Sequence, residues 1–196
     1  METLPKQEQW FTYADYKDWQ LKEGERFEVI YGEVFAISAP NARHQMVLTE
    51  LISRFHDYLQ EKHGRAFPAP YDVRLFFEED ESDDTIVQPD IVVVCDEKKR
   101  GPEGCRGAPD LIIEILSPQD TAIGMQRKFN LYRQAGVREY WVVDPVNNGV
   151  TVYLFDDDEF HNNSNRFLTE VYERNSSVPV TILSGFDIPL EQVFAE

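Results

Sequence analysis

The sequence predicts a mixed α/β fold in which a central sheet is covered on both faces. Residues 91–95 and 111–116 are hydrophobic at both alternating positions, as expected for strands that are buried on both sides. Stretches near 41–63 and 120–135 have the apolar period of amphipathic helices and stand before and after these strands. No repeat, low-complexity segment or long linker interrupts the chain, so we expect one domain over 1–196.

The elements follow in order along the chain. FEVIYGEVFAIS at 27–38 predicts an N-terminal hairpin that turns at Tyr31-Gly32. A helix is expected from Pro40-Asn41 to about His63, where Gly64 ends it. The remaining elements are expected as strands at about 66–77, 85–95 and 110–116, a helix over about 120–135 that stops at Gly136, a strand at 139–145, an antiparallel pair at 149–156 and 166–173, and a short helix in the tail 184–196.

The charge balance limits the partners that the protein can have. The chain carries 36 acidic and 19 basic residues, a net charge of −17, which repels polyanions at long range. This argues against a nonspecific nucleic-acid coat protein, but it leaves room for a local basic or metal-filled cleft. The acidic clusters at 78–84 and 155–159 are interpreted as solvated turns.

Other global features indicate a cytoplasmic protein. No apolar run approaches the length of about 18 residues that a membrane span requires, and the N-terminus lacks the pattern of a signal peptide. Cys95 and Cys105 form no CxxC pair and have no histidines at zinc-ligand spacing, so neither is assigned a role.

Glu114 interrupts the most hydrophobic run of the chain, PDLIIEILSPQD. On a strand it shares a face with Ile112 and Leu116, and Asp90 shares a face with Val92 at the start of its own strand. Neighbouring strands lie about 4.8 Å apart, so the two carboxylates can lie side by side if these strands pair. Asp110 is on the same face as Glu114 but about 13 Å away along the strand, too far to hold the same ion.

Two basic side chains also point inward on a helical wheel. Lys128 lies within the apolar arc of the second helix, and His44 lies near the centre of the inward arc of the first. Lys128 could instead extend to the rim, or pair with Glu114 as a buried ion pair, and Asp90 could simply close a turn. For His44 a structural role in the first helical turn is the commoner outcome.

Two acids and one base that converge on one place are unusual for a core. Close carboxylates repel, and a divalent cation relieves that repulsion. Because the ligands are all oxygen atoms, Mg²⁺ or Mn²⁺ is expected rather than zinc.

The same residues match a known pattern. PD at 89–90 followed by E-x-L at 114–116 resembles the PD-(D/E)XK nuclease superfamily, and the chain from roughly 20 to 190 resembles the Uma family of restriction endonucleases. The likeness is carried by RFEVIYGEVFAISAPNARH, QPDIVVV, PDLIIEILSPQD, RKFNLYRQAGVREYWVVDP and GVTVY. The resemblance implies a restriction-endonuclease-like sheet flanked by helices, with an extra N-terminal hairpin and C-terminal antiparallel strands.

This chain departs from the superfamily at the lysine, because Leu116 stands where the lysine is usual. The resemblance implies that the lysine has moved to the following helix, which makes Lys128 the candidate. The superfamily often adds an acid from its first helix, but Glu50 faces outward there. Glu28 and Glu33 in the hairpin are possible substitutes.

The resemblance therefore implies a magnesium-dependent endonuclease that hydrolyses DNA, with a homodimer as the usual assembly. Asp90, Glu114 and the backbone carbonyl of Ile115 would hold the ion, and Lys128 would orient the attacking water or offset charge on the phosphate. His44, if functional, would contact phosphate or assist proton transfer.

Two alternatives stay open. The net charge of −17 favours a catalytically silent member of the fold that acts as a binding or regulatory module. A glycosidase with paired carboxylates is weaker, because it leaves Lys128 unexplained and no aromatic sugar platform is evident near the strands.

Overall fold

The structure of the protein, a computed structural model, describes residues 9–155 and 167–195. Its central sheet has the strand order β12-β11-β10-β9-β6-β3. The strands are β3 (Arg65–Pro68), β6 (Ile91–Val94), β9 (Leu111–Ile115), β10 (Glu139–Asp144), β11 (Gly149–Phe155) and β12 (Phe167–Glu173). The pairs β3–β6, β6–β9, β10–β11 and β11–β12 are antiparallel, whereas β9 and β10 are parallel, so this is the mixed sheet that the sequence predicts.

A second sheet of shorter strands has the order β2-β1-β5-β4-β8-β7. It contains β1 (Phe27–Ile30), β2 (Glu33–Ala36), β4 (Val73–Arg74), β5 (Ile86–Val87), β7 (Arg100–Gly101) and β8 (Gly104–Arg106). The predicted hairpin is its β1–β2 edge. Tyr31 and Gly32 both have positive φ, 49° and 73°, which is the backbone that a tight two-residue hairpin turn requires.

The remaining elements are helices and a small ribbon. They are α1 (Tyr13–Tyr16), α2 (Ala42–Leu59), the 3₁₀-helix η1 (Glu97–Lys99), α3 (Ala122–Ala135), α4 (Leu190–Val193), and the antiparallel pair β13 (Ser177–Pro179) and β14 (Asp187–Pro189). Both long helices have the caps expected from their sequences. The side chain of Asn41 accepts from the His44 N–H at the start of α2, and Gly136 ends α3 at φ 87°.

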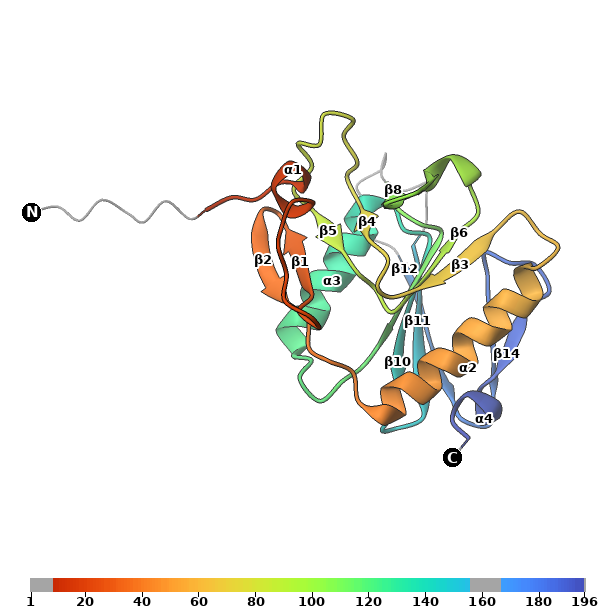
Figure 1. Cartoon of the computed structure of the whole chain (residues 1–196). Helices are drawn as coiled ribbons and strands as arrows, with labels where there is room; N and C mark the ends of the chain where they lie inside the picture. The colour runs from red at the N-terminus through yellow and green to blue at the C-terminus, as the bar shows by residue number, and fades with distance from the viewer. Residues whose placement is uncertain (1–8, 156–166, 196) are drawn as a thin grey trace, which may run out of the picture.

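The central sheet is buried on both faces, as the continuous apolar runs predict. Ile91, Val93 and Ile113 pack with α2 and the C-terminal segment on one face, while Val92 and Ile112 pack with α3 and the second sheet on the other. Figure 1 shows α2 and α3 on opposite sides of this sheet. Because α3 carries the chain from β9 to its parallel neighbour β10, it crosses the face on which Glu114 lies.

Three boundary predictions were wrong. The helix that was expected to reach His63 ends at Leu59, where the chain turns back toward β3, and the Lys62 N–H bonds the Leu59 carbonyl in that turn. The strands expected at 66–77 and 85–95 are each broken and shared between the two sheets. The breaks contain Pro70 and Pro89, which have no N–H to donate to a strand ladder.

The acidic segment 78–84 is not entirely a solvated turn. Asp83 is only 4% exposed and accepts hydrogen bonds from Arg74, including one of 2.8 Å from Nε to Oδ2. An acid can be buried here because it is paired with a buried guanidinium. In the second acidic segment, Phe155 ends β11 and residues 156–159 lie outside the described residues.

Among the residues that the structure describes, no helix combines the length and the apolar character needed to cross a bilayer.

Candidate active site

Asp90 and Glu114 are brought together by strand pairing. β6 and β9 are antiparallel, with Ile91 opposite Ile113, so one further step in the register places Asp90 opposite Glu114. Asp90 lies in the break between β5 and β6, and Glu114 lies within β9. The strand pairing therefore places the two acids side by side, as the sequence predicts.

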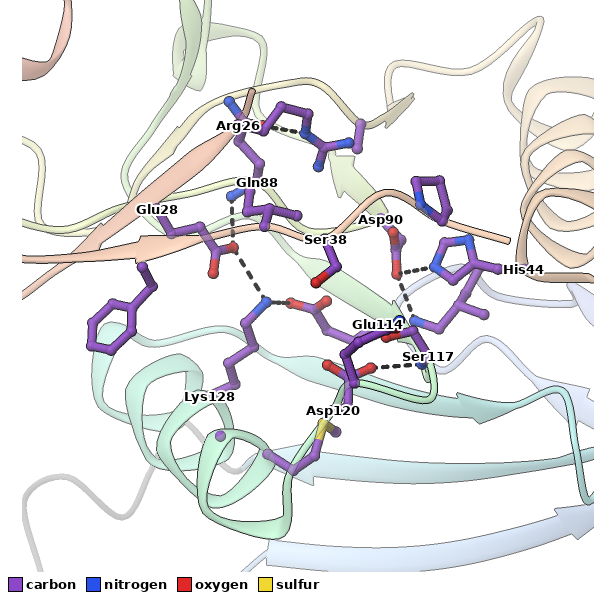
Figure 2. A pocket seen from close by; sticks show the side chains of 18 of the residues that line it. Arg26, Glu28, Ser38, His44, Gln88, Asp90, Glu114, Ser117, Asp120 and Lys128 are labelled. Atoms are coloured by element: carbon purple, nitrogen blue, oxygen red, sulfur yellow. Dashed lines mark hydrogen bonds and ion pairs between the residues drawn. The ribbon is translucent and has the colours of Figure 1, made fainter. Parts of the chain in front are cut away.

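The carboxylate of Asp90 is oriented by two contacts. Its Oδ2 accepts the Ile115 backbone N–H at 2.7 Å and lies 3.2 Å from Nε2 of His44 (Figure 2). Within the described part of the chain, Oδ1 has no hydrogen-bond donor. One oxygen is thus used to fix the side chain, and the other is left for a ligand.

Glu114 has the same division of its two oxygens. Its Oε1 accepts from Lys128 Nζ at 2.8 Å and from the Tyr132 hydroxyl at 2.5 Å, while Oε2 has no donor among the described residues. The side chain is almost fully buried. Burial raises the pKa of Glu114, and the adjacent Lys128 charge opposes that rise.

Lys128 reaches inward from α3, as the helical wheel predicts. Its Nζ lies between two acids, 2.8 Å from Glu114 Oε1 and 3.2 Å from Glu28 Oε1, and the side chain is 23% exposed (Figure 2). Burial alone lowers the pKa of Lys128, but the charges of Glu114 and Glu28 raise it above the ordinary value. The side chain is therefore an ammonium ion at neutral pH.

His44 is not a fully satisfied structural histidine. Its Nε2 faces Asp90, but its Nδ1 is buried and has no hydrogen-bond partner in the described chain. Burial lowers the pKa of His44, whereas the hydrogen bond and the charge of Asp90 raise it, with a net increase. The residue sits in the first turn of α2 because the Asn41 cap begins the helix three residues earlier.

Of the three other acids considered from the sequence, Glu28 belongs to the site, whereas Glu33 and Glu50 lie away from it. Glu28 joins the site through Lys128 and also accepts the Gln88 N–H at 3.0 Å. Glu33 is exposed on β2 and does not line the pocket in which Asp90, Glu114 and Lys128 lie. Glu50 pairs with Arg54 one turn along α2 and does not line it either, in agreement with its predicted outward position.

One pocket of about 260 Å³ is lined by Glu28, His44, Asp90, Glu114 and Lys128. Its wall also contains residues that the sequence analysis did not select, among them Arg26, Gln88, Asp120 and Arg127. Tyr132 was not predicted as a site residue, because its ring belongs to the apolar arc of α3 and that pattern takes no account of its hydroxyl. Its position four residues after Lys128 was the available signal, since such residues share a helix face.

The donor set fits a hard cation of the magnesium type. In the described ranges no three or more His, Cys, Asp and Glu side chains form a ready cage for a metal. Mg²⁺, however, is usually bound by only one or two carboxylates together with waters and substrate phosphates. Two facing carboxylates that each retain an uncommitted oxygen match that requirement.

Tyr132→Phe is expected to reduce both metal affinity and any metal-dependent activity by about 10- to 100-fold. The substitution keeps the buried ring but removes the donor that holds Oε1 of Glu114. Calorimetric titration with Mg²⁺ measures the affinity directly. Tyr140→Phe is a matched control, because this ring is equally buried in the same cluster but its hydroxyl has no partner in the described chain. Equal losses in both variants would contradict a specific role for Tyr132.

Comparisons with known proteins agree with this architecture. A family model, Uma2, described as "Putative restriction endonuclease", matches residues 13–191. The uncharacterized Synechocystis protein slr1290 is 23% identical over 145 residues, which cover 74% of each chain. A second Synechocystis protein, sll1609, also uncharacterized, is 27% identical over 136 residues, covering 68% of this chain and 74% of its own.

A solved structure shares the fold. The crystal structure of "a putative nuclease belonging to DUF820" from Anabaena variabilis superposes with a TM-score of 0.70 at 24% identity, over 94% of this chain and 97% of that chain. At this identity the likeness concerns the fold alone. The match to the family model spans most of the sequence, and we conclude that the chain belongs to the Uma2 family.

Proposed function

We propose that this protein is a metal-dependent nuclease that hydrolyses phosphodiester bonds of DNA. The observation that carries the proposal is the convergence of Asp90, Glu114 and Lys128 on one pocket, with one oxygen of each acid left uncommitted within the described chain. The family description and the nuclease-like fold support the same reaction class.

In this proposal Asp90, Glu114 and the backbone carbonyl of Ile115 hold Mg²⁺ or Mn²⁺. When bound, the cation polarises a phosphoryl oxygen and lowers the pKa of an attacking water. Lys128, which Glu28 and Glu114 hold in place as an ammonium ion, orients that water or offsets the charge that develops on the phosphate. His44 keeps the Asp90 carboxylate in position and is available for contact with phosphate or for proton transfer.

A homodimer is the assembly that we propose, because a two-fold axis presents one site to each strand of a duplex. The alternative is a silent member of the fold that binds partners without cleaving them. The excess of acidic residues favours that alternative, since duplex binding usually depends on Lys and Arg.

Cleavage of supercoiled plasmid decides between the two. We expect the wild-type protein to nick or linearise the plasmid in Mg²⁺, to stop in EDTA, and to resume when Mg²⁺ is restored. The double variant Asp90→Ala/Glu114→Ala, purified in the same way, is expected to be inactive, which controls for contaminating nucleases. Absence of wild-type cleavage together with absence of Mg²⁺ binding in calorimetry would favour the silent module.

A further inference from the structure

Two arginines line the pocket beyond the residues already assigned. Arg26 stands at the entry to β1, and Arg127 precedes Lys128 on α3. Neither forms an ion pair with a carboxylate in the described chain. Four other described arginines do form such pairs, namely Arg54, Arg74, Arg100 and Arg138. Four more form none in the described chain, Arg43, Arg65, Arg106 and Arg174, but these do not line the pocket.

Arg26 is held by a hydrogen-bond chain that leads to the carboxylate of Asp72, without a direct ion pair between them. Burial raises the pKa of Asp72, and the charge of Arg26 opposes that rise. The Nε of Arg26 donates to Oε1 of Gln88 at 3.0 Å. The amide of Gln88 cannot easily turn away, because its Nε2 donates to Asp72 at 2.7 Å and to the Tyr16 hydroxyl at 3.0 Å. One nitrogen of the guanidinium is therefore used for positioning, which leaves both Nη groups for an anion.

Arg127 is held by stacking. Its guanidinium lies over the ring of Phe35, 4.3 Å from the ring centroid, although the residue is exposed. Stacking fixes the plane of the guanidinium and leaves its N–H donors free at the edge. A positioned guanidinium with no carboxylate partner is suited to bidentate binding of phosphate.

The two arginines approach the pocket from different sides of Glu28. Phe35 pairs with Glu28 across the hairpin, so Arg127 lies on the β2 side, whereas Gln88 follows β5, the neighbour of β1 on its other side. Figure 2 shows Arg26 and Gln88 on one side of Glu28 and Lys128 on the other.

We propose that Arg26 and Arg127 bind phosphates of the nucleic-acid strand that neighbour the phosphodiester that is cleaved. This inference rests on the proposed function, because it takes the carboxylate pair as the place of cleavage. It makes the substrate a nucleic-acid strand with successive phosphates rather than a small phosphomonoester. It also explains how a protein of net charge −17 binds a polyanion, since the contacts are few, local and rigidly placed.

Binding without cleavage tests the inference. In an Asp90→Asn background, the affinity for a fluorescent DNA oligonucleotide is measured by anisotropy at several KCl concentrations. Arg26→Ala and Arg127→Ala are each expected to weaken binding about tenfold. Each is also expected to reduce the slope of log K against log salt by about 0.7–0.9, because each removes one phosphate contact. Arg127→Lys is expected to keep the slope while losing affinity, since it keeps the charge but not the planar donors.

Arg106→Ala is the matched control, because Arg106 is also exposed and lies over a phenylalanine ring, that of Phe77, but does not line the pocket. It is expected to bind DNA like the background. If Arg26→Ala fails to fold, as judged by circular dichroism, Arg26→Lys and the Arg127 variants decide the question. Unchanged affinity in the Arg127 variants and in the folded Arg26 variant, together with an unchanged salt slope in the alanine variants, would overturn the inference.

The outcome is separable from that of the proposed function. If the wild type cleaves DNA in Mg²⁺ and the arginine variants cleave with an unchanged KM, the phosphate contacts are wrong and the nuclease stands. If the wild type neither binds Mg²⁺ nor cleaves, the nuclease is wrong, and the anisotropy series alone decides whether the arginines contact nucleic acid.

Discussion

Asp90→Asn and Glu114→Gln are each expected to reduce the rate of DNA cleavage by about 10³-fold or more. Each amide keeps the shape of the side chain and one acceptor oxygen, so the Ile115 N–H and the Tyr132 hydroxyl keep a partner. What is lost is the negative charge that would hold the cation. Initial rates of plasmid cleavage and calorimetric Mg²⁺ titration are the measurements, and both are expected to fall together.

Glu33→Gln is the control for these two variants. Glu33 is an acid of the same hairpin that carries Glu28, but it is exposed and lies outside the pocket. Its neutralisation is expected to leave cleavage and Mg²⁺ affinity unchanged. Full activity in Asp90→Asn or Glu114→Gln would show that the reaction is carried by other residues.

Lys128→Met is expected to lower the free energy of unfolding by about 3 kcal/mol and to reduce cleavage by about 10²- to 10³-fold. The ammonium contacts both Glu28 and Glu114, so its removal leaves two buried carboxylates without their counter-charge. Urea denaturation measures the first effect, and plasmid cleavage measures the second.

A second substitution separates the two roles of Lys128. In Lys128→Met/Glu114→Gln one of the unpaired charges is neutralised, so much of the lost stability is expected to return while the rate of cleavage stays low. Lys98→Met, a change at an exposed lysine of η1, is expected to alter stability by less than about 0.5 kcal/mol. If Lys128→Met were as stable and as active as the wild type, the ion pairs of Lys128 would contribute neither to stability nor to cleavage.

The placement of the acid pair and of Lys128 could be predicted because it follows from the two-residue repeat of a strand and the roughly 3.6-residue repeat of a helix. Alternation along a strand puts Glu114 on the face of Ile112, and the helical wheel puts Lys128 on the face of α3 that covers it. Both depend only on local geometry and on the pairing of two neighbouring strands. The cytoplasmic location, the dimer and the identity of the metal have no such local signature and stay predictions.

The features that were missed depend on contacts between different segments of the chain. Asp83 is buried because Arg74 pairs with it, and a window of acidic residues cannot show that partner. The strands at 66–77 and 85–95 were expected to be continuous, whereas each segment contributes one short strand to each of the two large sheets. Short elements such as β7 and β8, at two and three residues, have no period at all.

The role of Tyr132 shows the limit of a hydrophobic pattern. A tyrosine contributes to an apolar arc through its ring, so the pattern places the residue correctly and ignores its hydroxyl. Only the position of Glu114 above α3 gives that hydroxyl a partner. Arg26 and Arg127 could not be selected from the sequence either. Only the fold shows that they line the pocket and that neither has an ion-pair partner in the described chain.

The most direct test of the shared cation is a crystal of the protein soaked in Mn²⁺ and measured at a wavelength that gives manganese an anomalous signal. We predict one strong peak between the carboxylates of Asp90 and Glu114, beside the Lys128 nitrogen, and no such peak in the Glu114→Gln protein. A wild-type crystal without manganese between these two side chains, in a protein that cleaves DNA in Mn²⁺, would contradict the assignment.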